Sequence, residues 1–79
     1  MKPHELAKPE GFAEHLRHIR LDKRILRKEV EAATGISGTY LYYLETGQRP
    51  PPTLKLLKRL EVYYGCEPLT LCREAWKEV

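Results

Sequence analysis

This 79-residue sequence has few cysteines and no long apolar run. Its two cysteines, Cys66 and Cys72, lack the CxxC spacing of common zinc sites, so we interpret them as free thiols in a reducing compartment. No apolar segment approaches the roughly 20 residues that a membrane-spanning helix needs. Residues 1–5 also lack the apolar stretch of a secretion signal. We therefore expect a cytoplasmic protein without a metal site or a membrane segment.

Signs of catalytic chemistry are also missing from the sequence. A chain of 9.3 kDa forms one small domain, which leaves little room for a deep substrate cleft. There is no glycine-rich phosphate loop and no paired-carboxylate site. His15 and His18 lie three positions apart, but neither cysteine stands in an activating pattern. We expect no enzymatic activity and no cofactor.

What the sequence does contain is charge, and the basic residues are unevenly distributed. The charged fraction is 32% and the net charge is +3. Residues 17–28 hold six basic residues and one acid, and residues 46–60 hold four basic residues and no acid. The tail from 61 to 79 is acidic on balance. Two basic segments suggest a face for a polyanion, although two solvated helix faces would give the same pattern.

Apolar residues recur at helical spacing in five segments, and no strand-like alternation occurs. The pattern predicts helices over residues 10–23, 27–34, 38–46, 54–64 and about 68–78. Their expected inward residues are Phe12, Leu16 and Ile19; Val30 and Ala33; Leu41 and Leu44; Leu54, Leu57, Leu60 and Tyr64; and Leu69, Cys72 and Trp76. The fold class is therefore all-α, with five short helices.

Glycine, serine, threonine and proline mark the helix boundaries. Gly35 supplies the left-handed conformation of a helix C-cap, and Ser37 and Thr53 can cap the helices that follow them. Pro3 and Pro9 discourage a helix in the polar N-terminal segment. We expect a flexible arm over residues 1–9 and a single domain over residues 10–79.

Two short helices joined by Gly35-Ile36-Ser37 form a helix-turn-helix pattern over about residues 27–46. The sequence then continues Glu45-x-Gly47-x-Arg49-Pro50, and Leu16, Ile19 and Arg20 precede the motif. Together these residues resemble the Cro/C1-type (XRE-like) family over roughly residues 11–70. The resemblance implies a compact, lambda-repressor-like five-helix fold. It also implies a bacterial or phage transcription regulator, most simply a repressor, that binds double-stranded DNA and is associated with the nucleoid.

The resemblance also implies roles for individual residues. Arg20 and Glu45 correspond to a buried structural ion pair. The base-contacting positions carry Gly38, Thr39 and Tyr43, with Tyr42 beside them, and the phosphate-contacting positions carry Arg27, Ser37, Gln48 and Arg49. A helix start presents free N–H groups and a positive dipole end, and the guanidinium of Arg27 adds a charge that can bind two phosphate oxygens.

The sequence departs from the family pattern at the base-contacting positions and at two further residues, Leu26 and Glu31. Gly38 has no side chain, and threonine and tyrosine give no bidentate base contact, so we expect weak or shape-dependent sequence specificity. Leu26 stands where a Ser or Thr cap is usual. Glu31 stands where a small residue is usual, and we expect its carboxylate to point outward or to pair with Arg27 or Lys28.

A protein-binding function is the alternative. Tyr40, Tyr42 and Tyr43 could form an aromatic patch for a partner, as in a module that acts on the transcription machinery or an antitoxin-like protein. Leu69 and Trp76 could form a homodimer surface, or Trp76 could pack within the domain. Arg27 and Arg49 on either side of residues 38–46 would favour DNA, whereas acids or an apolar tyrosine surface on that face would favour protein.

Overall fold

A computed structural model describes residues 11–67 and 70–76. Within these residues the chain forms helices and no strands, which confirms the all-α prediction. The helices are α2 (Gly11–Asp22), α3 (Arg27–Thr34), α4 (Gly38–Glu45), α5 (Leu54–Tyr64) and α6 (Thr70–Trp76). The predicted arm over residues 1–9, Leu69 and both ends of the last predicted helix lie outside the described residues.

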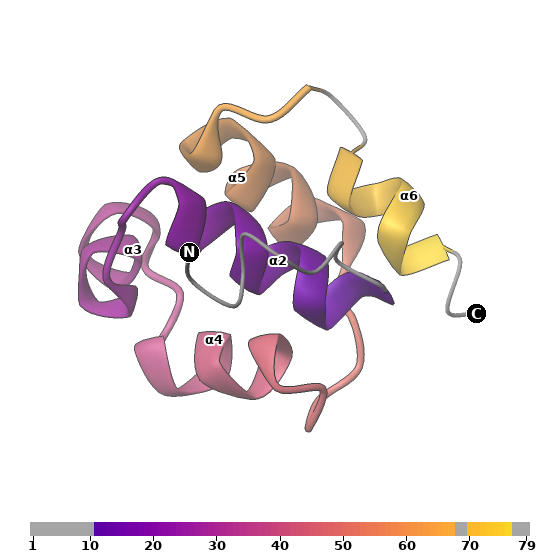
Figure 1. Cartoon of the computed structure of the whole chain (residues 1–79), viewed down its shortest axis with the longest axis horizontal. Coiled ribbons are helices and arrows are strands. Elements are labelled where there is room, and N and C mark those ends of the chain that lie inside the picture. The colour runs from indigo at the N-terminus through magenta and orange to yellow at the C-terminus, as the bar shows by residue number, and fades with distance from the viewer. Residues whose placement is uncertain (1–10, 68–69, 77–79) are drawn as a thin grey trace.

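Helix α2 runs through the middle of the molecule and contacts both α4 and α6 (Figure 1). Helix α3 packs against α4 and α5, and α6 packs against α5. In Figure 1, α4 lies below α2 and α5 lies above it, so α2 separates these two helices in this view. Helix α4 therefore lies at the lower edge of the molecule in this view, beside α3, with one face directed away from the other helices.

The core is built from apolar side chains of all five helices and of the α3–α4 turn. Its members are Phe12, Leu16, Val30, Ile36, Leu41, Leu44, Leu57, Leu60, Tyr64, Leu71 and Ala75. Most of the predicted inward residues are among them. Outside α6, two of these predictions were wrong, because Ala33 and Leu54 are exposed. In the eight-residue α3 only Val30 is fully enclosed, and Leu54 is the first residue of its helix.

The inward face of α6 also differs from the prediction. Leu71 and Ala75, which are four positions apart, are buried, whereas Cys72 is half-buried and Trp76 is 77% exposed. Trp76 therefore does not pack into the domain. The carboxylate of the buried Glu61 on α5 accepts the backbone N–H groups of Leu71 at 2.7 Å and Cys72 at 3.2 Å. These two hydrogen bonds hold the start of α6 against α5.

The turn between α3 and α4 forms as predicted. Gly35 has a left-handed φ of 80°, and its N–H donates to the carbonyl of Glu31 at 2.9 Å. Ile36 is buried beneath the turn. The Oγ of Ser37 accepts the N–H of Tyr40 at 3.3 Å and so caps α4. The turn fixes α4 relative to α3.

Candidate nucleic-acid interface

Arg20 and Glu45 join α2 to the last residue of α4. Arg20 Nε and Nη2 donate to the two oxygens of Glu45 at 2.7 and 2.9 Å, and Nη1 donates to the carbonyl of Ile25 at 2.8 Å. The two side chains are 6% and 0% exposed. The bond to Glu45 raises the pKa of Arg20. This bidentate pair has the geometry that the family resemblance implies for these two residues.

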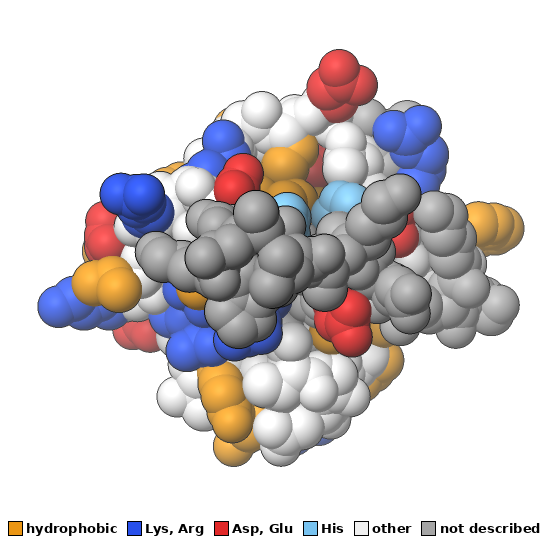
Figure 2. All heavy atoms as spheres, in the orientation of Figure 1, with side chains coloured by type: hydrophobic (Ala, Val, Ile, Leu, Met, Phe, Trp, Pro, Cys, Tyr) orange, Lys and Arg blue, Asp and Glu red, His pale blue; other side chains and the backbone are white. Residues whose placement is uncertain are grey.

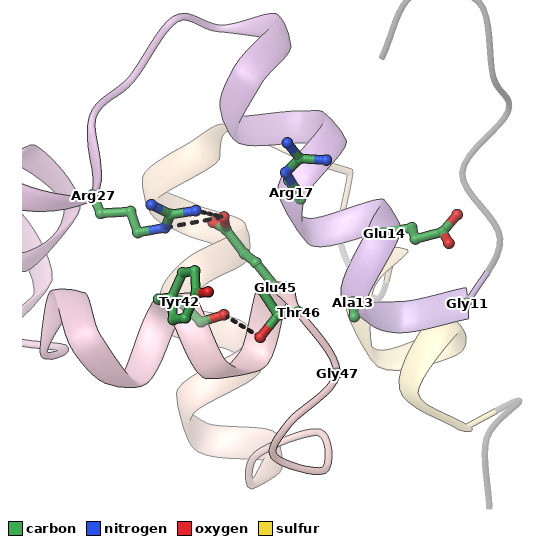
Figure 3. A pocket seen from close by; sticks show the side chains of 9 residues that line it. All are labelled: Gly11, Ala13, Glu14, Arg17, Arg27, Tyr42, Glu45, Thr46 and Gly47. Carbon is green, nitrogen blue, oxygen red and sulfur yellow. Dashed lines mark hydrogen bonds and ion pairs between the residues drawn. The ribbon is translucent and has the colours of Figure 1, made fainter. Parts of the chain in front are cut away.

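A second arginine binds the same carboxylate. Arg27 Nε and Nη2 lie 3.3 and 3.2 Å from Oε1 of Glu45, and the guanidinium carbon lies 5.0 Å from the centre of the Tyr42 ring. Figure 3 shows Arg27 reaching from the start of α3 to Glu45, above Tyr42. The sequence predicted a phosphate-binding role for Arg27 but gave no sign of these internal contacts. Its side chain remains one third exposed.

The three tyrosines of α4 have different environments. Tyr42 is exposed, Tyr43 is half-buried, and Tyr40 is half-buried against the core. The rings of Tyr42 and Tyr43 are tilted, with their centres 5.8 Å apart. Thr39 is exposed one turn earlier. The outward face of α4 therefore presents Thr39, Tyr42 and part of Tyr43, while Tyr40 serves mainly to pack the helix.

Two open hollows lie on either side of this face. One, of about 560 Å³, is lined by Arg17 of α2, Arg27 and Tyr42. Figure 3 shows that its walls come from α2, the start of α3 and the end of α4. The other, of about 480 Å³, is lined by Thr39, Tyr43 and Arg49 among others. Each side of α4 thus has an arginine.

Arg17 was not among the predicted site residues. It lies three positions before Arg20 and is exposed, so the two arginines of α2 have different surroundings. In the sequence both belong to the same basic segment, and nothing in that segment distinguishes the buried arginine from the exposed one.

The loop after α4 is folded back onto that helix. The N–H groups of Gln48 and Arg49 donate to the carbonyl of Tyr43 at 2.9 and 3.3 Å. The side-chain amide of Gln48 donates to Oγ1 of Thr46 at 2.9 Å. Both Gln48 and Arg49 are exposed. The backbone bonds therefore hold Arg49 beside the outward face of α4.

Figure 2 shows how charge is distributed on one face of the molecule. Basic side chains gather between α2 and α4, and uncharged and apolar side chains cover α4 itself. Acidic side chains also occur on this face. Glu45 is buried and adds no exposed charge, but Glu14 lines the hollow beside Arg17 and Arg27. The surface around α4 thus combines Arg17, Arg27 and Arg49 with the aromatic side chains of Tyr42 and Tyr43.

A family model described as a helix-turn-helix domain matches residues 12–74, which is more than half of the chain. The chain belongs to this Cro/C1-type helix-turn-helix family. Neither a curated protein nor a solved structure matches it significantly. Helices α3 and α4 are the two helices of the motif. Membership implies DNA binding and transcription regulation as the function, with DNA as a partner.

This helix-turn-helix domain departs from its family at the start of each motif helix. Leu26 offers no side-chain acceptor, but its own N–H donates to Oε1 of Glu29 at 3.0 Å, so half of a capping box is kept. Oε1 of Glu31 accepts the N–H of Gly38 at 2.5 Å. Of the two alternatives expected for Glu31, the structure has the outward one: its side chain is exposed, and it binds the start of α4 rather than Arg27 or Lys28.

Two thiols and the possibility of a metal site remain to be considered among the described residues. Burial raises the pKa of both Cys66 and Cys72, so each thiol is less readily ionised than a free cysteine. Among residues 11–67 and 70–76, no group of three His, Cys, Asp or Glu is placed to hold a metal ion. Over the same residues, no helix is long and apolar enough to cross a membrane.

Proposed function

We propose that this helix-turn-helix domain regulates transcription, as a cytoplasmic, nucleoid-associated repressor, by placing α4 in the major groove of double-stranded DNA while α3 crosses the backbone. The observation that carries the proposal is the position of Arg27 and Arg49 on opposite sides of the outward face of α4. A helix in the major groove has a phosphate backbone on each side, and arginine is suited to both.

The proposed contacts divide into two groups. Thr39, Tyr42 and Tyr43 face the bases, and Gly38 lets the start of α4 approach them closely. Arg27, Ser37, Gln48 and Arg49 contact phosphates, together with Arg17. Because phosphate contacts carry no sequence information, most of the affinity should be independent of sequence.

Arg27 can bind a phosphate without leaving Glu45. A guanidinium has five N–H donors, and the contacts to Glu45 involve only Nε and Nη2. The positive charge also lies over the Tyr42 ring. A phosphate would then be the third group around a side chain that is already held in place.

The test is binding of the full chain to mixed-sequence duplex DNA across a salt series, measured by fluorescence anisotropy. Each phosphate that an arginine neutralises adds about −0.9 to the log–log slope, so Arg17, Arg27 and Arg49 together should give a slope of about −3. Arg49→Ala should weaken binding to all sequences and make the slope shallower by about 1, because one phosphate contact is lost. Arg27→Ala should also weaken binding and make the slope shallower by about 1, and it removes the contact of Arg27 with the Tyr42 ring.

Arg73→Ala, on the exposed side of α6, is the matched control and should leave the slope unchanged. Circular dichroism of each variant separates a lost contact from a lost fold. Negligible binding of the wild-type chain even at low salt would contradict the proposal. It would favour the alternative, a protein partner on the surface formed by Tyr40, Tyr42 and Tyr43, of which Tyr42 is exposed and the other two are half-buried.

A homodimer would match the two-fold symmetry of paired half-sites. Trp76, at the end of α6, lies beside a mainly apolar groove of about 540 Å³ formed with Pro50, Pro51, Pro52 and Leu54. An exposed tryptophan next to such a groove is typical of an interface anchor. Sedimentation with and without duplex DNA tests whether the chain dimerises, and Trp76→Ala should abolish the dimer if this surface forms it.

A further inference from the structure

The first residue of α4 is a glycine, and a carboxylate from α3 occupies the space beside it. A Cβ atom placed on Gly38 would lie 3.1 Å from Oε1 of Glu31 and 3.8 Å from Cβ of Arg27. The side chain of Glu31 thus ends where a side chain of residue 38 would begin. A small residue is usual at position 31, and the longer side chain of Glu31 fits here because Gly38 has no side chain.

Glu31 is held at this place and remains exposed. Its Oε1 accepts the N–H of Gly38, and a negative charge at the start of a helix is stabilised by the helix dipole. Its second oxygen, Oε2, has no partner among the described residues, and Arg27 is directed to Glu45 instead. The charge of Glu31 therefore faces outward, at the end of α4 that the docking above brings to the bases.

We propose that Glu31 is a specificity-determining residue, which accepts a hydrogen bond from a cytosine amino group at the base pair facing the start of α4. This inference rests on the proposed function. In helix-turn-helix docking the N-terminal residues of the second helix contact base edges. A carboxylate can only accept hydrogen bonds, and cytosine N4 is the major-groove donor that suits it.

Adenine and guanine suit the carboxylate less well. Adenine also has an amino donor, but its N7 acceptor lies beside that donor and repels a carboxylate, and guanine presents two acceptors. The same repulsion acts on phosphate oxygens. Glu31 therefore makes Ser37, the neighbour of Gly38, the weakest of the proposed phosphate contacts.

The experiment is selection of binding sites by the full chain from a randomised duplex library, for wild type, Glu31→Gln and Glu29→Gln. Glu29→Gln is the matched control, because it removes the same charge from the same helix at the start of α3 rather than α4. The wild type should enrich cytosine at one position. Changing that base pair in the selected duplex should weaken binding by about tenfold.

Glu31→Gln should lose the preference for cytosine and turn to bases with acceptors, because its amide oxygen keeps the bond to Gly38 and its NH₂ group faces the bases. Glu31→Ala should lose the preference without gaining another, and it covers the case in which the glutamine variant fails to fold. Glu29→Gln should keep the wild-type preference.

Two results overturn the inference. One is a cytosine preference that persists in Glu31→Gln. The other is an affinity change in Glu31→Gln that is equal for every duplex and equal to that of Glu29→Gln, which would reduce Glu31 to a general repulsive charge. A wild type that binds no duplex at all is a separate failure, because it overturns the proposed function itself.

Discussion

The two ends of α4 are each held by a carboxylate, and the two carboxylates differ in almost every respect. Glu45, at the C-terminal end, is fully buried and binds both Arg20 and Arg27. Glu31 approaches the N-terminal end from α3, is exposed, and accepts one N–H. A buried charge that loses its partner is costly, whereas an exposed one can return to water. Burial therefore makes Glu45 structural and leaves Glu31 available to a ligand.

Removal of Glu45 should have the largest effect. Glu45→Ala leaves Arg20 buried without its partner, so we expect the free energy of unfolding to fall by about 3–5 kcal/mol. Urea unfolding followed by circular dichroism measures the loss. Glu45→Gln, which keeps an acceptor oxygen, should lose less. A loss below about 1 kcal/mol in Glu45→Ala would show that the pair contributes little.

Glu61 tests whether burial alone explains why removal of Glu45 should destabilise the domain more than removal of Glu31. It is 5% exposed, like Glu45, but it accepts the N–H groups of Leu71 and Cys72. We expect Glu61→Ala to cost about 1–3 kcal/mol, because buried N–H groups lose their acceptor. Trp76 is on α6, so its fluorescence reports on this helix. In Glu61→Ala the fluorescence transition should therefore occur at a lower urea concentration than the circular dichroism transition.

The control for Glu61 is Glu67→Ala, which changes an exposed residue just before α6 and should leave both signals unchanged. If the fluorescence and circular dichroism transitions of Glu61→Ala coincide, α6 is not released separately, and Glu61 then stabilises the whole domain rather than one helix.

Removal of Glu31 should have the smallest effect on stability. Glu31→Ala leaves the N–H of Gly38 to water, so a loss of at most about 1 kcal/mol, typical of a helix cap, is expected in the same urea experiment. A loss as large as that of Glu45→Ala would contradict the comparison and would make Glu31 a structural residue.

Much of the fold could be predicted, because its signals are local. The turn from Gly35 to Ser37 depends on a left-handed glycine, a buried Ile36 and a capping hydroxyl, and all three are visible in the sequence. The face that a short helix buries is harder to predict. In α6 the spacing of Cys72 and Trp76 fits a helix as well as that of Leu71 and Ala75, and only packing against α2 and α5 decides between them.

The candidate site was predictable only where a resemblance supplied the pairing. The Arg20–Glu45 pair was expected on that basis. Arg27 meets Glu45 across 18 positions, and Glu31 meets Gly38 across the turn; neither contact has a periodic or spacing signal. The conformation of Arg24 could not be predicted either. It adopts a left-handed φ of 57°, a conformation that a sequence usually indicates with glycine.

The two contacts that hold the Arg27 side chain, with Glu45 and with the Tyr42 ring, also change the entropic cost of binding a ligand. A free arginine side chain samples many rotamers, and fixing it costs up to about 2 kcal/mol of conformational entropy. In this domain Glu45 and the Tyr42 ring already restrict the side chain before any ligand arrives. Arg27 is therefore preorganised, and its ordering belongs to the folding of the domain rather than to the binding event.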